Sequence, residues 1–310
     1  MLAVGAFLGT LLLISVVTYF AIRLVGGDLA VAALGREVTQ EQLESYRAAN
    51  GLNDPMLLQY WNWLREFATG QWGVDPVTAR PIISTVVAPM LYTFLLAFVA
   101  LAISIPISMS FGVWSAWRYG RKPDRVALTA SVIVVATPEF VIAIGGILLF
   151  GVWLRVLPVD STAITIAESP TEMLAAFILP VGTLVIAMSA YFYRIARSAA
   201  YEVLESSYFE AARLRGLGTW FLIRHYVLRN AMPPLVNAIA IGAIHLIGGV
   251  VLVEMIFGYP GLGQALVQSV SGGSADVVQA IVVTLAAVFL AIGLLADLTV
   301  TSLTRPLRGG

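Results

Sequence analysis

Three ionisable side chains lie inside long apolar stretches of this sequence and are the first candidates for chemistry: Glu139, His245 and Glu254. A charged group at the centre of a membrane helix costs ~2.5–3.5 kcal/mol on insertion scales, so such residues usually face protein or a water-filled path. We therefore consider all three as candidates for a polar path across a membrane. The structural alternative for each is a hydrogen bond to a neighbouring helix. Glu254 also lies close to a break at Gly258, from which its carboxylate could reach the membrane edge.

The arrangement of these residues does not support catalysis. Ser198, His245 and Glu254 are the residue types of a hydrolytic triad, but the sequence has no Gly-x-Ser-x-Gly elbow, no His-Glu-x-x-His helix and no paired intramembrane aspartates. The only lysine, Lys122, precedes Pro123 rather than Ser or Thr, so there is no phosphate-binding P-loop. Because there are no cysteines and two histidines, a four-ligand Cys/His zinc site cannot be assembled. The sequence therefore predicts no catalytic residue and no metal site.

The composition is that of a protein embedded in a membrane. Of the 310 residues, 59% are hydrophobic and 12% are charged, and the mean hydropathy is +0.89. A helix rises ~1.5 Å per residue and needs about 20 apolar residues to cross a bilayer. Because the apolar stretches lack the alternation of barrel strands, we predict an all-α membrane protein. Six transmembrane helices are expected, near residues 2–25, 86–117, 126–154, 173–194, 232–257 and 278–303.

The distribution of cations predicts the orientation. The first stretch, residues 1–25, lacks a basic n-region and a small-residue cleavage pattern, so we interpret it as a retained helix rather than a signal peptide. Lys and Arg are enriched in short cytoplasmic loops. With the N-terminus inside, twelve of the eighteen cations are cytoplasmic, in part on the loop at about 195–231 and the tail at 304–310, so both termini are expected there. The net charge of zero does not suggest a nucleic-acid partner.

The segment at residues 26–85 is expected outside the cytoplasm as a small helical unit that precedes the remaining five spans at 86–303. Thr39 and Gln42 have the spacing of a capping box, which predicts a helix that begins at Gln40 and ends before Gly51.

A second helix is predicted to begin at Pro55 and end at Gly70, since proline is tolerated in a first helical turn. Its aromatic face has two interpretations: contact with lipid headgroups, or contact with an external protein that delivers a solute. The face consists of Tyr60, Trp61, Trp63, Leu64 and Phe67.

A polar stretch between the fourth and fifth predicted spans forms a short helix in our interpretation. It contains Glu210-Ala211-Ala212-Arg213 and ends at Gly216, a residue that readily takes a left-handed conformation after a helix. The small residues permit close approach of another backbone. Leu204, Tyr208 and Ala211, spaced by four and three positions, are predicted to share one face of this helix. The alternative is an amphipathic hairpin that only connects two spans.

This stretch, with Asn230 further along the loop, resembles the ATPase-coupling motif of permease subunits in bacterial ATP-binding-cassette importers. The wider chain resembles the first permease of the dipeptide, oligopeptide and nickel uptake family. Together the matching stretches extend over nearly the whole length. They are Leu34-Gly35 to Thr39, Gln42-Leu43, Gly51-Leu52, Gln59-Tyr60, Trp63-Leu64, Gly70-Gln71-Trp72-Gly73, Pro138-Glu139-Phe140 and Glu254-Met255-Ile256-Phe257-Gly258-Tyr259-Pro260-Gly261-Leu262-Gly263.

The resemblance implies a type I importer permease in the bacterial inner membrane, with no cofactor of its own. Glu210, Ala211, Ala212, Arg213, Gly216 and Asn230 would then couple the chain to two separate ATPase subunits, which bind ATP and Mg²⁺. It also implies an extracytoplasmic substrate-binding protein and a second homologous permease, identical or different. Small residues of the fifth span, Gly242, Ala243, Gly248 and Gly249, suit close helix contact, and one surface of that span is expected to meet the second permease.

Alternatives remain for both substrate and class. Di- and oligopeptides are the expected cargo, and nickel, glutathione or another small solute is the alternative for the same architecture. A channel or secondary transporter that works without an ATPase is the alternative of another class, together with the intramembrane hydrolase considered above.

Overall fold

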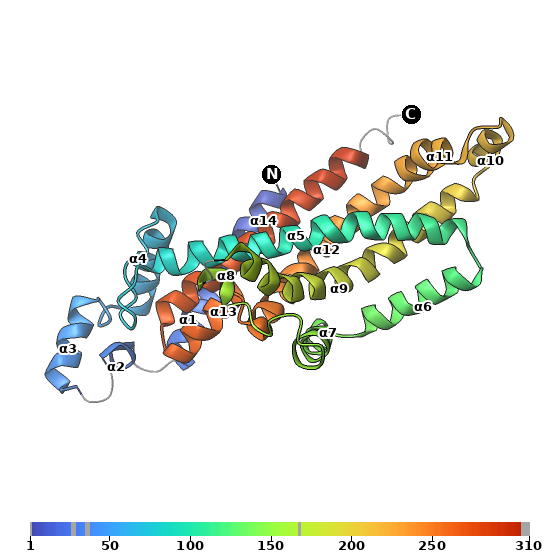
Figure 1. The fold of residues 1–310 in the computed structure, drawn as a ribbon. Coiled ribbons are helices and arrows are strands. Elements are labelled where there is room, and N and C mark those ends of the chain that lie inside the picture. The colour runs from blue at the N-terminus through green and yellow to red at the C-terminus, as the bar shows by residue number, and fades with distance from the viewer. Residues whose placement is uncertain (1, 26–28, 35–37, 167–168, 305–310) are drawn as a thin grey trace. The chain divides into compact units, whose positions relative to one another are not determined.

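The computed structural model describes residues 2–25, 29–34, 38–166 and 169–304, and they are overwhelmingly helical (Figure 1). Residues 305–310 of the predicted tail lie outside the described residues. The described helices, in chain order, are α1 (Leu2–Val25), α2 (Leu29–Leu34), α3 (Gln40–Ala49), α4 (Met56–Thr69), α5 (Ile82–Trp117), α6 (Lys122–Ala136), α7 (Glu139–Gly146), η1 (Ile147–Trp153), α8 (Ala163–Ile166), α9 (Pro170–Leu204), α10 (Ser207–Leu214), α11 (Thr219–Leu222), η2 (Ile223–Leu228), α12 (Arg229–Phe257), α13 (Leu262–Gly272) and α14 (Ala275–Thr304).

By length and apolarity, four helices of the described chain can each cross a membrane, and two bent pairs raise the total to six. This agrees with the predicted all-α fold of six spans. Two of the four, α5 and α9, have 36 and 35 residues, which is well beyond the ~20 that a bilayer requires. Helix α9 continues to Leu204, past the predicted end of the fourth span at residue 194, and α11, η2 and α12 make most of residues 219–257 helical.

The third predicted span, residues 126–154, is not one continuous helix, contrary to our expectation. Helix α6 ends at Ala136, and α7 begins after Pro138, with a bend of 103° between the two. Proline lacks a backbone N–H and disfavours helical backbone at the preceding residue, here Thr137, which is extended (ψ 122°). The helix is therefore broken before Pro138, and the break places Glu139 in the first turn of a new helix.

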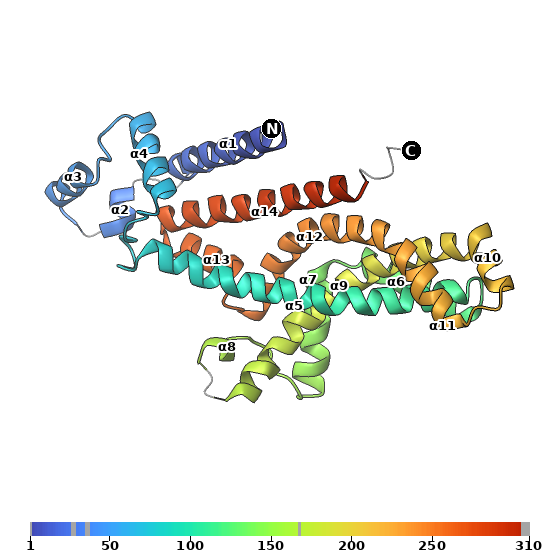
Figure 2. The same cartoon turned by 90° about the horizontal axis from the view of Figure 1, so that it is seen from above.

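The described contacts divide the chain into two compact units, each built from separate parts of the sequence. Unit 1 comprises residues 1–93 and 260–291, and unit 2 comprises residues 94–259 and 292–310. In unit 1, α4 lies beside α1 and the first turns of α14 (Figure 2). Its apolar core joins the start of α5 to α13 and α14 through Ile82, Val86, Leu262, Ala265, Val277, Ala280 and Ile281.

Helices α3 and α4 of unit 1 begin and end close to the predicted positions. The Thr39 hydroxyl accepts a bond from the Gln42 amide at 3.3 Å, and the Gln42 side chain accepts one from the Thr39 amide at 3.0 Å, so the capping box is confirmed. Gly51 and Gly70 follow α3 and α4 with φ of +64° and +76°, the left-handed conformation that glycine adopts without strain.

Three aromatic residues of α4 contact rings of the same chain while remaining partly exposed, so both interpretations of that face stay predictions. Tyr60, Trp63 and Phe67 form a row with Tyr19 of α1 at one end and Trp72 at the other, with ring centroids 4.6–6.2 Å apart along it. The exception, Trp61, is 63% exposed. These rings therefore connect α4 to α1, since aromatic pairs at such distances attract each other.

A buried aspartate closes the segment before α5 onto the start of α14. Asp75 is 1% exposed and accepts hydrogen bonds from the Thr78 amide at 3.1 Å and from the Ser274 hydroxyl at 2.9 Å. A buried carboxylate is stable only when hydrogen bonds or charges replace its hydration. The Ser274 contact joins residues 199 positions apart and holds the segment before α5 against the start of α14.

Helix α9 is central to unit 2, where it packs against α6, α7, α8 and α12. Small residues allow α5 to approach α9 closely. A Cβ built on Gly112 of α5 would lie 2.7 Å from the Cβ of Ala196 and 2.9 Å from the amide nitrogen of Arg197, both in α9. Real Cβ atoms do not come this close, so glycine at position 112 permits the α5–α9 contact.

Candidate functional site

The short helix α10 is held at both ends by local interactions. At its start, the Ser206 hydroxyl accepts a bond from the Phe209 amide at 3.4 Å, which is an N-cap. At its end, Gly216 has a φ of +76° and its amide donates to the Arg213 carbonyl at 3.0 Å. The predicted left-handed glycine is confirmed, and it turns the chain towards α11.

The buried face of α10 differs from the face that Leu204, Tyr208 and Ala211 were predicted to share. Phe209 and Ala212 are each 3% exposed, whereas Tyr208 is 45% exposed and Ala211 is exposed. The prediction assumed one helix from Leu204 onwards, but α9 ends at Leu204 and α10 begins again after the Ser206 cap. A new helix start changes the angular position of every later residue, so the predicted register was wrong.

The buried face of α10 rests on an apolar platform built by four other elements. Small and medium side chains from α5 and α9 meet residues from α11 and η2 in this cluster. Its buried members are Val113, Ala116, Ala200, Val203, Phe209, Ala212, Leu222 and Val227. Because Phe209 and Ala212 are embedded here, a displacement of α10 is expected to move α5 and α9 with it.

The predicted coupling residues occupy different positions around α10. Glu210, Ala211 and Arg213 are exposed on the helix, and Ala212 is the member that packs into the platform. Asn230 is on α12, where its amide donates to the Tyr226 carbonyl of the preceding turn at 2.7 Å. Ala212 therefore connects the motif to the protein interior. The side chain of Asn230, by contrast, bonds only to the backbone one turn earlier in its own helical segment.

The solvent-facing side of α10 and α11 carries large apolar residues. Leu214 is 79% exposed and Trp220 is 72% exposed, and Tyr208 and Phe221 both contact the ring of Tyr226. We call Tyr208, Leu214, Trp220 and Phe221 the apolar cap. Exposed clusters of this kind mark interaction sites.

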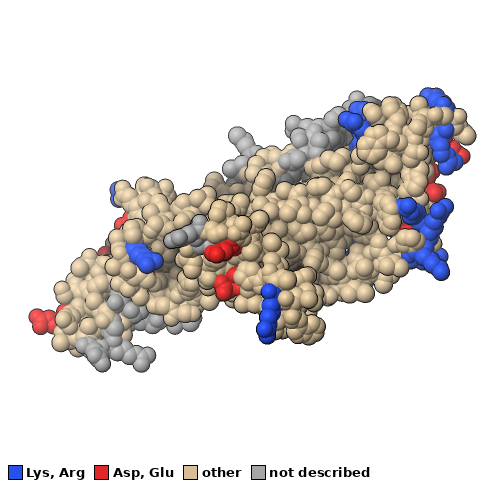
Figure 3. All heavy atoms as spheres, viewed as in Figure 1, with Lys and Arg blue, Asp and Glu red and all other residues tan. Residues whose placement is uncertain are grey.

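Exposed arginines lie close in sequence to the apolar cap. Arg213, Arg215 and Arg224 are exposed, as is Glu210, and Lys and Arg gather at the end of unit 2 that carries α10 (Figure 3). We call these three arginines the basic rim.

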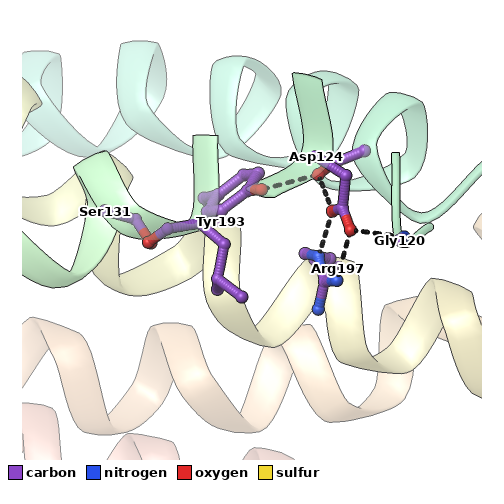
Figure 4. A network of polar contacts seen from close by, with 7 residues as sticks. Gly120, Asp124, Ser131, Tyr193 and Arg197 are labelled. Carbon is purple, nitrogen blue, oxygen red and sulfur yellow. Dashed lines mark hydrogen bonds and ion pairs between the residues drawn. The ribbon is translucent and has the colours of Figure 1, made fainter. Parts of the chain in front are cut away.

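A buried polar network lies within the helices that carry the platform (Figure 4). Asp124 of α6 accepts bonds from Arg197 Nε at 2.6 Å and Nη2 at 2.8 Å, from Ser115 Oγ at 2.6 Å and from the Gly120 amide at 2.9 Å. The Tyr193 hydroxyl lies 2.6 Å from Ser115 Oγ. The side chains of Asp124 and Arg197 are 2% and 14% exposed. This bidentate pair therefore joins α5, α6 and α9.

Sequence reasoning missed this network. In the sequence, Arg197 contributed only to the prediction of orientation, as one of the cytoplasmic cations. Asp124 follows Pro123 in a run of basic residues, any of which could equally pair with it. The partners are 73 positions apart, and no local pattern specifies such a pair.

The three charged candidates of the spans occupy different surroundings. Glu139 is partly buried against α12, where a Cβ built on Gly249 would lie 3.2 Å from its Oε1. His245 is exposed. Glu254 is fully buried within the chain, which fits the structural alternative given for it.

Small residues of α12 serve packing inside this chain. A Cβ on Gly242 would lie 2.8 Å from the ring of Phe192 in α9, and Gly249 receives the Glu139 side chain. Gly248, by contrast, has open space at its Cβ position. Two of the glycines that suggested contact with a second permease thus bring this chain's own helices together.

Comparison with known proteins agrees with this geometry. The family described as "Binding-protein-dependent transport system inner membrane component" matches residues 104–309, and its N-terminal counterpart matches residues 2–98. An amino acid ABC transporter structure aligns with a TM-score of 0.52 at 19% identity, covering 71% of this chain and 94% of that one. At that identity the likeness shows the fold alone.

Two curated relatives match almost the full length. The probable peptide ABC transporter permease protein y4tP of Sinorhizobium fredii is 30% identical, over 96% of this chain and 94% of the relative. The glutathione transport system permease protein GsiC of Pectobacterium atrosepticum is 31% identical, over 96% and 95%.

The fold and the matches define the class: this is a multi-pass helical permease of the bacterial inner membrane. The chain belongs to the binding-protein-dependent transport system inner membrane component family, and it is a permease subunit of an ATP-driven importer.

Proposed function

We propose that this chain forms one half of the translocation path of an importer for di- or oligopeptides and receives the work of ATP hydrolysis through α10. In this proposal two partner ATPase subunits bind ATP and Mg²⁺, and the chain itself is not catalytic. The observation that carries the proposal is the form of α10, a capped helix with Phe209 and Ala212 embedded in the platform and the apolar cap exposed on the other side.

The apolar cap is the proposed ATPase contact. An exposed Leu214 and Trp220 can fill a groove on another protein, and large apolar and aromatic side chains contribute most to such interfaces. The rim of Arg213, Arg215 and Arg224 would orient the partner by attraction to acidic side chains. A push on the cap would then be transmitted through Phe209 to α5 and α9.

Peptides are the proposed cargo because of the names of the two relatives described above. One is named for peptides, and glutathione, named for the other, is itself a modified tripeptide. Nickel transport has no such support here. Glutathione is therefore the second candidate cargo.

The complete importer in this proposal contains a second homologous permease and an extracytoplasmic substrate-binding protein. Both termini are proposed to be cytoplasmic. The cation distribution supports this orientation, since it places the basic rim of the apolar cap on the same side.

Site-specific crosslinking tests the proposed contact. Because the sequence has no native cysteine, an introduced cysteine is the only thiol of this chain that can react. Leu214→Cys on the apolar cap should crosslink to a purified ATPase subunit. Trp153→Cys is the matched control, because Trp153 is equally exposed at 76% but lies on η1. Equal crosslinking at both positions, or none at Leu214→Cys in an assembly that transports, would contradict the proposal.

Uptake by vesicles tests the cargo. Vesicles that contain both permeases and both ATPases should accumulate a labelled dipeptide when ATP and the binding protein are supplied. Uptake of labelled glutathione with no dipeptide uptake would favour the second candidate. Uptake that persists without the ATPases would contradict an importer of this class.

A further inference from the structure

A cavity of about 550 Å³ lies in unit 1, in the part of the chain proposed to be extracytoplasmic. It is bordered by α1, α3, α4 and the beginning of α14, and its size falls within the range of small-ligand sites. Figure 2 shows α1, α4 and the first turns of α14 side by side around this region. The residues that line the cavity all belong to unit 1.

A partly buried cation at the cavity has unused hydrogen-bonding capacity. Arg23 of α1 lies over the ring of Tyr19, with its Cζ 3.5 Å from the ring centroid, and its Nη1 donates to Gln279 Oε1 at a long 3.4 Å. Its Nε is buried and has no hydrogen-bond partner in the described structure. A guanidinium presents five donors, so this group retains the capacity to bind an anion.

Tyr19 also lines the cavity with an unpaired polar atom. The residue is 0% exposed, and its hydroxyl has no hydrogen-bond partner within the described chain. Buried polar groups are nearly always hydrogen-bonded, and an orphaned one requires an explanation. A polar ligand in the cavity would satisfy this hydroxyl.

Two carboxylates complete the charge pattern. Glu66 of α4 and Asp276 of α14 line the same cavity as Arg23. One cation and two anions on separate helices suit a ligand that carries charges of both signs, since each charge could then meet its opposite.

An aromatic wall borders the charged groups. Trp63, Phe67 and Trp72 all line the cavity and stack in sequence, with centroids 5.2 and 4.6 Å apart. Such a wall offers apolar area to a side chain and a negative ring face to an ammonium group.

We propose that this cavity is a binding site for a small zwitterion, which places its anionic group on Arg23 and Tyr19, its ammonium group at Asp276 and Glu66, and its apolar portion on the aromatic wall. A free dipeptide and the headgroup of phosphatidylethanolamine share this chemistry. The site is separate from α10 and needs no ATPase for binding, so its test is independent of the coupling test.

Binding should be measured on the full chain in micelles of the non-ionic detergent dodecyl maltoside, which has no charged headgroup to compete, by titration calorimetry with alanyl-phenylalanine. The N-acetylated dipeptide, which lacks the ammonium group, and the dipeptide amide, which lacks the carboxylate, should each bind about tenfold more weakly or worse, as expected for loss of one charge-assisted contact. These two ligands test the charge pattern without altering the protein.

Two variants test the assignment of Arg23. Arg23→Met should weaken binding of the free dipeptide about tenfold or more, with little further effect on the amide. Arg23→Lys keeps the charge and should retain part of the affinity. It therefore distinguishes loss of the charge from loss of the folded structure. Arg65→Met is the matched control, because Arg65 is exposed on α4 and does not line the cavity.

A comparison of two ligands distinguishes a free dipeptide from a lipid headgroup as the natural occupant of the cavity. If glycerophosphoethanolamine binds to the unmodified chain and loses affinity in Arg23→Met, while the dipeptide does not bind, the site is a lipid-headgroup site. Equal affinity of dipeptide, amide and acetylated dipeptide, or binding of neither ligand class to the folded chain, would overturn the proposal.

Discussion

The buried pair of Asp124 and Arg197 offers a strong test of how the platform under α10 is held together. Removing one partner of a buried ion pair typically costs 3–5 kcal/mol, because the remaining charge is left in the interior. In Arg197→Met, the Ser115 hydroxyl and the Gly120 amide still donate to Asp124. We therefore expect the lower end, a loss of about 3 kcal/mol in unfolding free energy.

Two further variants complete a double-mutant cycle. Asp124→Leu should cost about 3 kcal/mol as well, since it leaves the Arg197 guanidinium, which is 14% exposed, without its carboxylate. The double variant Asp124→Leu/Arg197→Met removes both charges and should be less destabilised than either single variant. The expected coupling energy is about 3 kcal/mol or more.

Reversible unfolding in mixed micelles, followed by the fluorescence of the seven tryptophans, measures these energies. Arg194→Met is the matched control, because Arg194 is exposed three positions earlier on α9 and should change stability by less than about 0.5 kcal/mol. If the double variant loses the sum of the two single effects, the pair is not coupled, and the network does not hold α6 to α9.

Substitutions at three other positions, Gly216, Gly249 and Asp75, test further parts of the structure. Gly216→Val should lower ATP-dependent uptake at normal expression, because a φ of +76° strains a β-branched residue by about 1–3 kcal/mol. Gly218→Val is the control and should transport normally, because the φ of Gly218 is −61°. Equal uptake by the two variants would show that strain at position 216 does not affect transport. Gly249→Ala places a methyl group 3.2 Å from a carboxylate oxygen of α7 and should reduce uptake or stability more than Gly248→Ala, whose Cβ meets open space. Asp75→Asn should lower the unfolding free energy by about 1–3 kcal/mol, because one acceptor oxygen becomes a donor amide; unchanged unfolding would mean that its donors find other partners.

The sequence alone determined the features that depend on neighbours within a few residues. The capping box at Thr39, the helix ends before Gly51 and Gly70, and the left-handed Gly216 follow from interactions that span at most four positions. The number of spans followed from apolar length, because a bilayer requires about 20 apolar residues whatever the tertiary arrangement.

Only the tertiary structure decided which distant side chains meet. Asp124 pairs with Arg197 across 73 positions, and Tyr19 joins the aromatic row of α4 from a different helix. The buried face of α10 depends on the helix break at Ser206, which shifts the register from Tyr208 to Phe209. Local patterns define helices, but burial depends on which surfaces pack together, and that is a property of the whole fold.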